Sequence, residues 1–253
     1  MNQNLAISLP AAESIDPWTS FEALVRSRRA VHQFSDRPVD AIDIEAMLDA
    51  ARLAPSSFNL QPYTFYWLRS PDLRARLAEL CLGQKAARTA AELIVCVAHW
   101  DEWQICADEH LAWLREQGVA QASFDFHADI YRRLRIFFAR GPFNLLGRLR
   151  TLASWLIGVT RPTLRPPKGP REHATWAVKS ASLACAHAML AARARGLDTC
   201  PLEGFDEVRV AALLGLRGDR FALPMILAVG HREPSGRMDP QWRRDRAKLV
   251  QVL

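Results

Sequence analysis

Hydrophobic positions along this chain follow two periods, and their alternation predicts a mixture of helices and strands. Helical spacing of apolar residues predicts helices at residues 21–28, 42–53, 73–82, 175–194 and 206–216. Runs of strand length predict strands at 63–70, 92–100 and 224–231, a short strand or turn at 197–202, and a weak edge strand at 247–253. Because strands and long helices are mixed without a separating linker, we expect one α+β domain over residues 1–253.

Local signals set the ends of three of these helices. Thr19 or Ser20 is the expected N-cap of the first helix, because hydroxyl side chains accept hydrogen bonds from its free N–H groups. Pro55 ends the second helix, and Gly196 caps the long helix at 175–194. The many alanines and serines of that long helix permit a close helix contact, either across a subunit interface or within the core.

Residues 104–172 differ from the rest of the chain in periodicity and in charge. Helical spacing dominates there, so we expect a helical insertion on the single core. The chain has a net charge of +6, although residues 131–171 alone contain ten basic and no acidic residues. The remainder therefore carries a charge of −4, and the basic character belongs to this one segment.

The composition argues against several classes of protein. The N-terminus lacks a basic region followed by an apolar run, and no stretch approaches the ~18 apolar residues of a membrane span. The five cysteines are scattered without a C-x-x-C pair, and no two histidines have the H-x-x-x-H spacing. We therefore expect a cytoplasmic protein with reduced thiols and no metal site, in which Cys200 is a small, unreactive buried residue.

Four short segments are poorly explained as scaffolding. "APSSFNLQPY" (54–63) places rigid and amide-bearing residues between a helix and a strand, where one turn residue would suffice. "RSRRAVHQF" (26–34) concentrates guanidinium groups that can bind phosphate oxygens in pairs, although a solvated basic surface would look the same. "PLEGF" (201–205) offers a glycine whose backbone a ligand can approach. "QWRRDR" (241–246) adds arginines that alone indicate only a charged terminus.

Taken together and in this order, these segments resemble the FMN-dependent nitroreductase family. The resemblance extends to "GQKAARTAAELIVCVA", to "WAVKSASLACAHAMLAARARGLDTCPLEGFD", and to "ILAVGH" with arginines thirteen and fourteen residues after Gly230. It covers much of the chain outside residues 104–172. The resemblance implies a nitroreductase-like α+β fold with a central, mostly antiparallel sheet flanked by helices. It also implies an intertwined homodimer with exchange of C-terminal strands, a role for which the tail "LVQVL" is suited.

The resemblance assigns the unusual loop to a flavin site shared between the two subunits. Pro55, Ser56 and Ser57 would lie along the flavin of the partner subunit, and Asn59 would help to hold it. The amide and proline at positions 61 and 62 would fix the loop. A purely structural loop remains the alternative.

The same resemblance places the arginines at the phosphate of FMN. Arg28 and Arg29 would bind it together with Arg243 or Arg244, since several guanidinium groups can neutralise a near-dianionic phosphate through charge-assisted hydrogen bonds. The family usually has serine at the position of Ala30, so one hydroxyl contact is missing here.

A second departure from the family pattern is His32, where arginine or lysine is usual. A cation beside the flavin stabilises negative charge on its reduced form and so raises its potential. Histidine supplies that charge only when protonated, so we expect the flavin potential to fall as the pH rises. Lys85 is a candidate substitute cation.

The ring of the flavin would be contacted by residues around the glycine turn. Gln84 matches the amide position at the pyrimidine edge, because an amide both donates and accepts there. Pro201 and Leu202 lead into the turn, where Glu203 and Gly204 would place a backbone N–H opposite the hydride-accepting N5 atom. We count Glu203 and Gly204 as the catalytic positions, with the carboxylate expected to make a structural hydrogen bond rather than to act as an acid.

The resemblance implies an FMN-dependent enzyme in which NADH or NADPH reduces the flavin and a second substrate reoxidises it, giving ping-pong kinetics. Nitroaromatics, quinones or related electron-poor acceptors are the expected small-molecule partners. Because no G-x-G-x-x-G segment follows a strand, the nicotinamide would stack directly on the flavin. Two alternatives stay open: a specialised reductive dehalogenase or biosynthetic oxidase on the same fold, and a flavin-binding membrane-associated or regulatory protein without turnover.

The basic segment 131–171 interleaves arginines with aromatic and aliphatic residues. It fits a helical lid over the active site. It also fits a peripheral membrane element at the inner membrane surface, since helices with aromatic faces and basic flanks bind anionic interfaces. Nucleic-acid binding is the weakest of the three interpretations, because no recognised binding motif accompanies the charge.

Overall fold

An antiparallel sheet lies at the centre of the computed structural model, which describes residues 16–138, 145–163, 170–236 and 238–253. Its four strands are hydrogen-bonded in the order β1-β2-β4-β3. They span Tyr63–Trp67 (β1), Glu92–His99 (β2), Asp198–Leu202 (β3) and Phe221–Gly230 (β4). The predicted α+β architecture with an antiparallel sheet is confirmed, and β1 and β3 are its outer strands.

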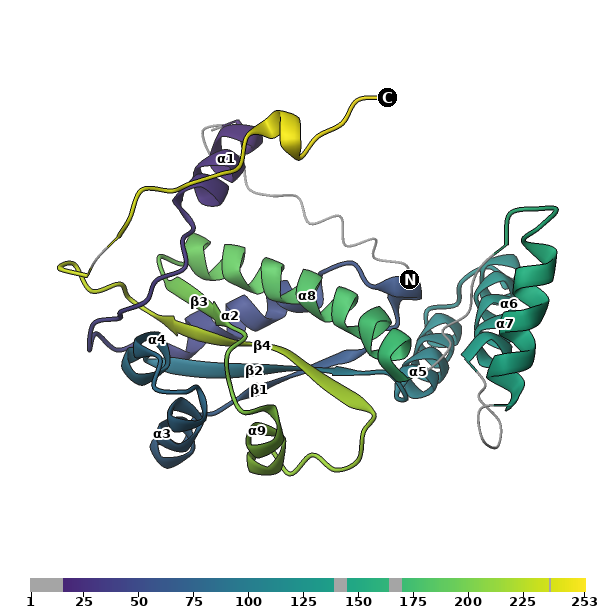
Figure 1. Ribbon diagram of the computed structural model, residues 1–253, viewed down its shortest axis with the longest axis horizontal. Coiled ribbons are helices and arrows are strands. Elements are labelled where there is room, and N and C mark those ends of the chain that lie inside the picture. Colours follow the sequence, from purple (N-terminus) through teal and green to yellow (C-terminus); the bar gives the residue numbers. More distant parts are fainter. Residues whose placement is uncertain (1–15, 139–144, 164–169, 237) are drawn as a thin grey trace.

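Helices cover both faces of this sheet (Figure 1). One face packs against α2 (Ala41–Arg52) and α8 (Pro170–Ala194), and the other against α3 (Pro71–Leu80), α4 (Lys85–Thr89) and α9 (Glu207–Leu213). Successive residues of β2 alternate between the two resulting clusters, with Val95 in one and Ile94 in the other. This explains why β2 is apolar at nearly every position rather than at every second one.

The alanines of α8 belong to the core of the chain itself. Five of them are fully buried at helical spacing beside the sheet and α2: Ala177, Ala181, Ala184, Ala188 and Ala192. Their small side chains let the helix axis approach the sheet closely. Of the two interpretations drawn from the sequence, the intramolecular contact therefore accounts for this stripe.

The segment expected as an insertion forms α5 (Trp103–Glu116), α6 (Gln121–Phe138) and α7 (Leu145–Ile157) at one end of the sheet (Figure 1). A third apolar cluster, which includes Trp103 and Tyr131, ties α5 and α6 to the core through Leu60. The expected boundary at residue 172 falls inside α8.

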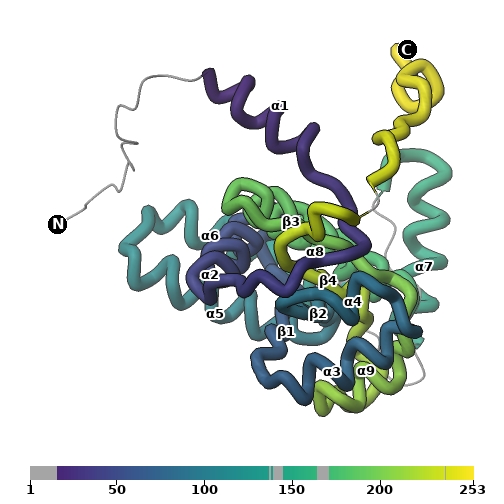
Figure 2. The backbone as a smooth tube through the Cα atoms, turned by 90° about the vertical axis from the view of Figure 1, so that its left-hand side faces the viewer, coloured from purple at the N-terminus to yellow at the C-terminus, as the bar shows by residue number. Residues whose placement is uncertain are grey.

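The two ends of the described chain leave the core (Figures 1 and 2). α1 (Pro17–Ser27) begins earlier than predicted, because Asp16 rather than Thr19 is its N-cap: the Asp16 carboxylate accepts from the Thr19 N–H at 3.0 Å. The tail forms a short 3₁₀ turn, η3 (Arg246–Lys248), and no strand among the described residues that follow it. The predicted edge strand at 247–253 is thus wrong for the single chain, in which the tail pairs with no strand.

Candidate functional site

The predicted phosphate-binding segment runs along the outer edge of β3. Ala30 forms a parallel bridge with Thr199, and the Val31 N–H donates to the Thr199 carbonyl at 3.0 Å. This pairing fixes the backbone on both sides of Ala30. Arg28 and His32 are thereby held at defined positions along the strand.

A pocket of about 250 Å³ lies between this segment and the tail. It is lined by Arg28, Arg29, Ala30, His32, Pro240, Gln241, Trp242 and Arg243. An Arg29 guanidinium nitrogen donates to the carbonyl of Asp239 at 2.5 Å, which connects the two sides. The lining has three arginines and no acidic side chain, so it suits an anion. Of the two tail arginines considered from the sequence, Arg243 lines the pocket and Arg244 does not.

A buried carboxylate that the sequence patterns did not indicate holds this segment in place. Asp198, 4% exposed at the start of β3, accepts two hydrogen bonds from Arg232, at 2.5 and 2.7 Å, and one from Arg193 at 3.2 Å. Arg193 also donates to the Ser27 hydroxyl at 3.2 Å, at the end of α1. The carboxylate raises the pKa of Arg232 by accepting these bonds. The one sequence feature that could have indicated this role is the position of an aspartate at the start of a buried strand.

The glycine turn and the predicted amide are in direct contact. The Gln84 side-chain nitrogen donates to the carbonyls of Gly204, at 2.5 Å, and of Cys81, at 3.1 Å. Glu203 and Gly204 are exposed immediately after Leu202, the last residue of β3. The Glu203 carboxylate is exposed and makes no hydrogen bond or ion pair with the described residues, so the structural bond expected of it is not seen within this chain.

Cys200 lies on β3 beside this site. Its sulfur is 3.7 Å from the His32 Nδ1 atom, and the residue is 2% exposed. Burial raises the pKa of the thiol to about 11, so it is protonated at neutral pH and a poor nucleophile. The predicted burial of Cys200 is confirmed, and the raised pKa agrees with the expectation of an unreactive thiol.

The unusual loop between α2 and β1 adopts a strained backbone. Phe58, Asn59 and Gln61 have φ angles of 55°, 57° and 41°, in the left-handed region that non-glycine residues rarely occupy. The backbone N–H of Gln61 donates to the Ser56 hydroxyl at 3.1 Å, and that of Ser57 donates to the Ser180 hydroxyl of α8 at 3.3 Å. The Gln61 side-chain nitrogen also donates to the Asn59 side-chain oxygen at 3.3 Å, so Gln61 helps to hold the loop, as the sequence indicated.

Two residues of the insertion reinforce this loop from outside. The Tyr131 hydroxyl of α6 donates to the Phe58 carbonyl at 3.3 Å, and it lies 2.5 Å from the Nδ1 atom of His110 on α5. Burial, and then the neighbouring His127, lower the pKa of His110. Neither contact was predicted, because each joins segments distant in the sequence.

The loop and the arginine segment lie at opposite edges of the sheet. The loop leads into β1, whereas residues 28–32 pair with β3, and β2 and β4 lie between them. Three interstrand spacings amount to about 14 Å. The loop instead lines a separate pocket of about 850 Å³, to which Asn59, Tyr63 and Trp113 contribute. One chain therefore separates the two halves of the expected site.

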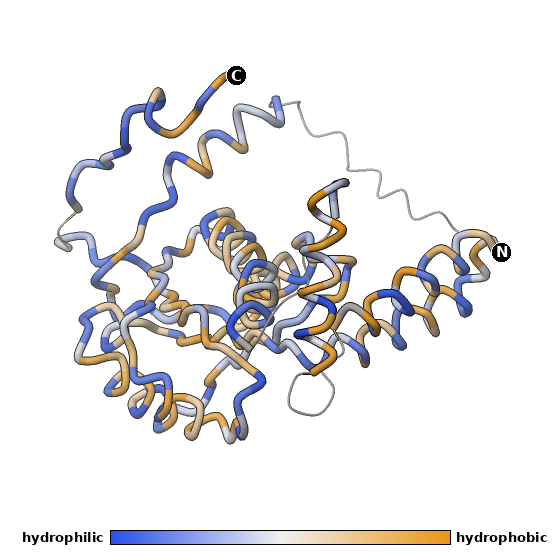
Figure 3. Tube along the Cα trace, turned by 45° about the vertical axis from the view of Figure 1, so that its right-hand side comes forward, coloured by the Kyte–Doolittle hydropathy of each residue, from blue (hydrophilic) through white to orange (hydrophobic). Residues whose placement is uncertain are grey.

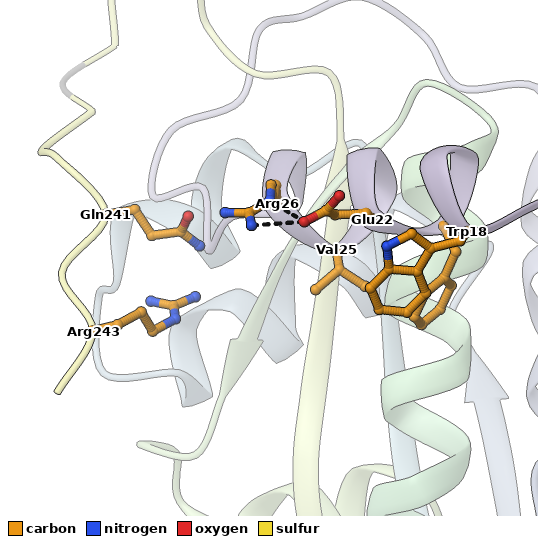
Figure 4. Close-up of a pocket in the computed structure, with 7 residues that line it drawn as sticks. Trp18, Glu22, Val25, Arg26, Gln241 and Arg243 are labelled. Atoms are coloured by element: carbon orange, nitrogen blue, oxygen red, sulfur yellow. Dashed lines mark hydrogen bonds and ion pairs between the residues drawn. The ribbon is translucent and has the colours of Figure 1, made fainter. Parts of the chain in front are cut away.

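The apolar side of α1 is also uncovered. Trp18, Phe21 and Val25 are 64%, 48% and 43% exposed, and they line a pocket of about 390 Å³ that Gln241 and Arg243 close from the tail (Figure 4). The dashed line in Figure 4 marks the Glu22–Arg26 ion pair on the helix surface, at 2.7 Å. None of the α1 residues is buried. α1 therefore buries almost no apolar surface within the single chain.

Comparison with known proteins supports the resemblance seen in the sequence. The model of the "Nitroreductase family" matches residues 25–231. The chain is 26% identical to MhqN of Bacillus subtilis, described as an NAD(P)H nitroreductase, over 92% of this chain and 98% of that protein. It is 29% identical to the protein DrgA of a Synechocystis species, over 84% of each chain.

Solved structures show the same fold. The nitroreductase ydfN of Bacillus subtilis superimposes with a TM-score of 0.72 at 22% identity, covering 93% of this chain and all of that one. A nitroreductase of Exiguobacterium sibiricum, solved in complex with FMN, gives a TM-score of 0.66 at 21% identity, over 95% and 98% of the two chains.

The family model, the curated relatives and the shared fold agree on one class of protein. The family match extends over most of the described core; it includes residues 28–32, 55–59 and 201–204 and ends before the tail residues of the anion pocket. The chain belongs to the nitroreductase family.

Proposed function

We propose that this protein binds FMN along the outer edge of β3 and uses it to pass electrons from NADH or NADPH to a nitroaromatic, a quinone or a related electron-poor acceptor. One observation carries the proposal: a cationic pocket at Arg28, Arg29 and Arg243 and an exposed glycine turn at Gly204 both border the same strand. An elongated cofactor with a phosphate at one end and a polar ring at the other fits this arrangement.

At the phosphate end, the proposal rests on the arginines. Arg28 and Arg29 are half-buried beside β3, and the Arg28 side chain makes no hydrogen bond or ion pair with the described residues. Charge-assisted hydrogen bonds to a phosphate contribute about 1.5–3 kcal/mol each. Arg29 contributes partly by bonding the Asp239 carbonyl, which keeps the tail and Arg243 against the pocket.

At the ring end, the chain offers rigid backbone groups. When bound, FMN supplies the hydride acceptance that no side chain here can perform. Gln84 holds the Gly204 carbonyl and so fixes the turn whose N–H groups would face the ring. The Gln84 amide oxygen accepts no bond from the described residues and is available to a ligand donor. A backbone donor cannot lose its proton at ordinary pH, so this contact is independent of pH.

The second half of the site, Pro55 to Asn59, would come from a second copy of the chain in a homodimer. Three features support this proposal: the two halves lie at opposite sheet edges, the apolar face of α1 is uncovered, and β1 has a free edge. The exposed tail residues 249–253 are of suitable length and alternation to pair with that edge in a partner. Exchange of tails would then cover several of these surfaces at once.

The direct test is an absorption spectrum of the purified protein, followed by heat release and identification of the bound flavin. We expect FMN at one per chain, oxidation of NADH or NADPH with menadione, and parallel double-reciprocal plots that indicate ping-pong kinetics. A colourless protein that also fails to take up added FMN would contradict the proposal. Bound FMN without turnover on nitroaromatics or quinones would reject those acceptors and favour a specialised one.

A further inference from the structure

The short helix α7 has its apolar side facing outward. Six of its large apolar residues are 48–58% exposed: Leu145, Leu146, Leu149, Leu152, Trp155 and Leu156. No residue of α7 belongs to any of the three apolar clusters formed by the described residues. Figure 3 shows that hydrophobic positions lie on helices outside the core as well as around the sheet.

The less exposed side of α7 consists of small residues and of Arg150. Gly147 is buried, and Thr151, Ser154 and Gly158 are half-buried, at a spacing of three or four residues. The two hydroxyls donate to carbonyls of their own helix, Thr151 to Gly147 at 2.9 Å and Ser154 to Thr151 at 2.9 Å. An ordinary surface helix places its apolar stripe inward and its polar side outward, so α7 is inverted.

Basic residues lie within α7 and shortly after it, without acidic residues among them. The whole segment 130–171 contains no acidic residue, and Arg148 and Arg161 are exposed without an ion pair to the described residues. Arg150 donates to the carbonyl of Ile136 and so attaches α7 to the end of α6, where Ile136 itself is 64% exposed. The described part of the chain contains no helix long and apolar enough to cross a membrane. The arrangement thus suits an element that lies in an interface.

We propose that the exposed face of α7 docks on an anionic lipid surface, with Leu149, Leu152 and Leu156 inserted among the acyl chains and Arg148 and Arg161 beside the headgroups. Charge complementarity favours this occupant. Two copies that met through α7 would bring two segments without acidic residues together, which like-charge repulsion opposes. A nucleic acid would match the charge but would leave the aliphatic face in water.

Vesicle flotation tests this directly on the full-length holoprotein. Vesicles of equal parts phosphatidylcholine and phosphatidylglycerol should carry the protein upward at low salt, and vesicles of pure phosphatidylcholine should carry much less. Replacing both Arg148 and Arg161 by glutamine should reduce the apparent affinity by about fivefold for each arginine. The triple variant Leu149→Gln/Leu152→Gln/Leu156→Gln should lose binding.

A matched control replaces three apolar residues that are exposed elsewhere, Ile42, Leu73 and Val208, by glutamine and should float like the wild type. Circular dichroism and light scattering on all variants separate lost docking from misfolding or a changed oligomeric state. Three results would overturn the proposal: no flotation with anionic vesicles, equal flotation of the leucine variant and the wild type, or a dimer that the leucine variant breaks while vesicles bind neither protein. Binding to a single-stranded oligonucleotide without any vesicle binding would likewise overturn it. None of these readouts depends on enzymatic turnover.

Discussion

The side-chain nitrogen of Gln84 lies 2.5 Å from the carbonyl oxygen of Gly204 and donates a hydrogen bond to it. Gln84 is the N-cap residue of α4, and Gly204 belongs to the turn after β3, so the contact joins the sheet edge to a helix on one face. The orientation of the turn therefore depends on a residue 120 positions earlier in the chain.

Replacing Gln84 by alanine should weaken FMN binding without unfolding the protein. The loss of one hydrogen bond at the turn, together with one potential ligand contact, is expected to reduce the affinity about tenfold. Flavin fluorescence quenching measures this. Gln121→Ala, which removes an exposed amide bonded to Asp125 at 2.8 Å on α6, is the control and should leave FMN affinity unchanged. Equal affinities for all three proteins would rule out the assigned role.

Arg28 and the two tail arginines, Arg243 and Arg244, should differ in how much each contributes to FMN affinity. Arg28→Ala and Arg243→Ala each remove a guanidinium that lines the anion pocket, and each should weaken FMN binding by about 10- to 150-fold. Arg244→Ala should change it far less. Arg209→Ala, which breaks an exposed ion pair with Asp206, provides the charge-matched control. Isothermal titration with FMN and with riboflavin distinguishes phosphate contacts, because riboflavin should bind all four variants alike.

The hydroxyl of Tyr131 should stabilise the strained loop. Tyr131→Phe keeps the buried ring and removes the bond to the Phe58 carbonyl, so backbone amides of residues 57–61 should exchange faster with deuterium. The overall free energy of unfolding should fall by only about 1 kcal/mol. Unchanged exchange in the loop would show that its own hydrogen bonds suffice to hold it.

Two buried thiols predict how stability depends on alkaline pH. Burial raises the pKa of both Cys81 and Cys200 to about 11. An unfolded thiol ionises near pH ~8.5, so between that pH and about 11 the folded chain retains protons that the unfolded chain releases. The free energy of unfolding should therefore fall as the pH rises through this window. Urea unfolding should show a shallower fall for the Cys81→Ala/Cys200→Ala double variant than for the wild type. Parallel pH profiles would contradict the assignment.

Gly230 is required for packing at the end of β4. A Cβ atom there would lie 2.9 Å from a ring carbon of the buried Phe34. Gly230→Ala should therefore destabilise the protein by about 1–3 kcal/mol. Gly204→Ala is the comparison, because its Cβ would meet only the Gln84 amide, at 3.4 Å. Thermal melts of the two variants should differ clearly, and equal melting temperatures would refute the packing argument.

The sequence predicted those parts of the fold that local patterns determine. The apolar run at 92–100 became β2 within one residue, since both its faces are buried. Boundaries failed where two local signals compete. The strand expected at 63–70 ends at Trp67, because Pro71 starts α3 with Ser70 as its N-cap.

Contacts between distant segments were not predictable in the same way. The family pattern indicated Arg28 and Gly204 individually. The Asp198 carboxylate orders the neighbouring segment through Arg193, which bonds both Asp198 and Ser27. No spacing in the sequence indicates the contact between Arg193 and Ser27. The tail shows the converse case, in which a local pattern was present but the predicted element did not form. Its weak alternation suggested a strand, yet residues 249–253 of the single chain do not pair with the free edge of β1 and form no strand.

The placement of the arginine segment on β3 and of the strained loop next to β1 has a genetic consequence. If each flavin site takes one half from either subunit, a chain damaged at Arg28 and a chain damaged at Asn59 are each inactive alone. When they are produced together, a mixed pair contains one doubly damaged site and one intact site. Two inactive alleles should then restore partial activity in one cell, whereas two alleles damaged in the same half should not.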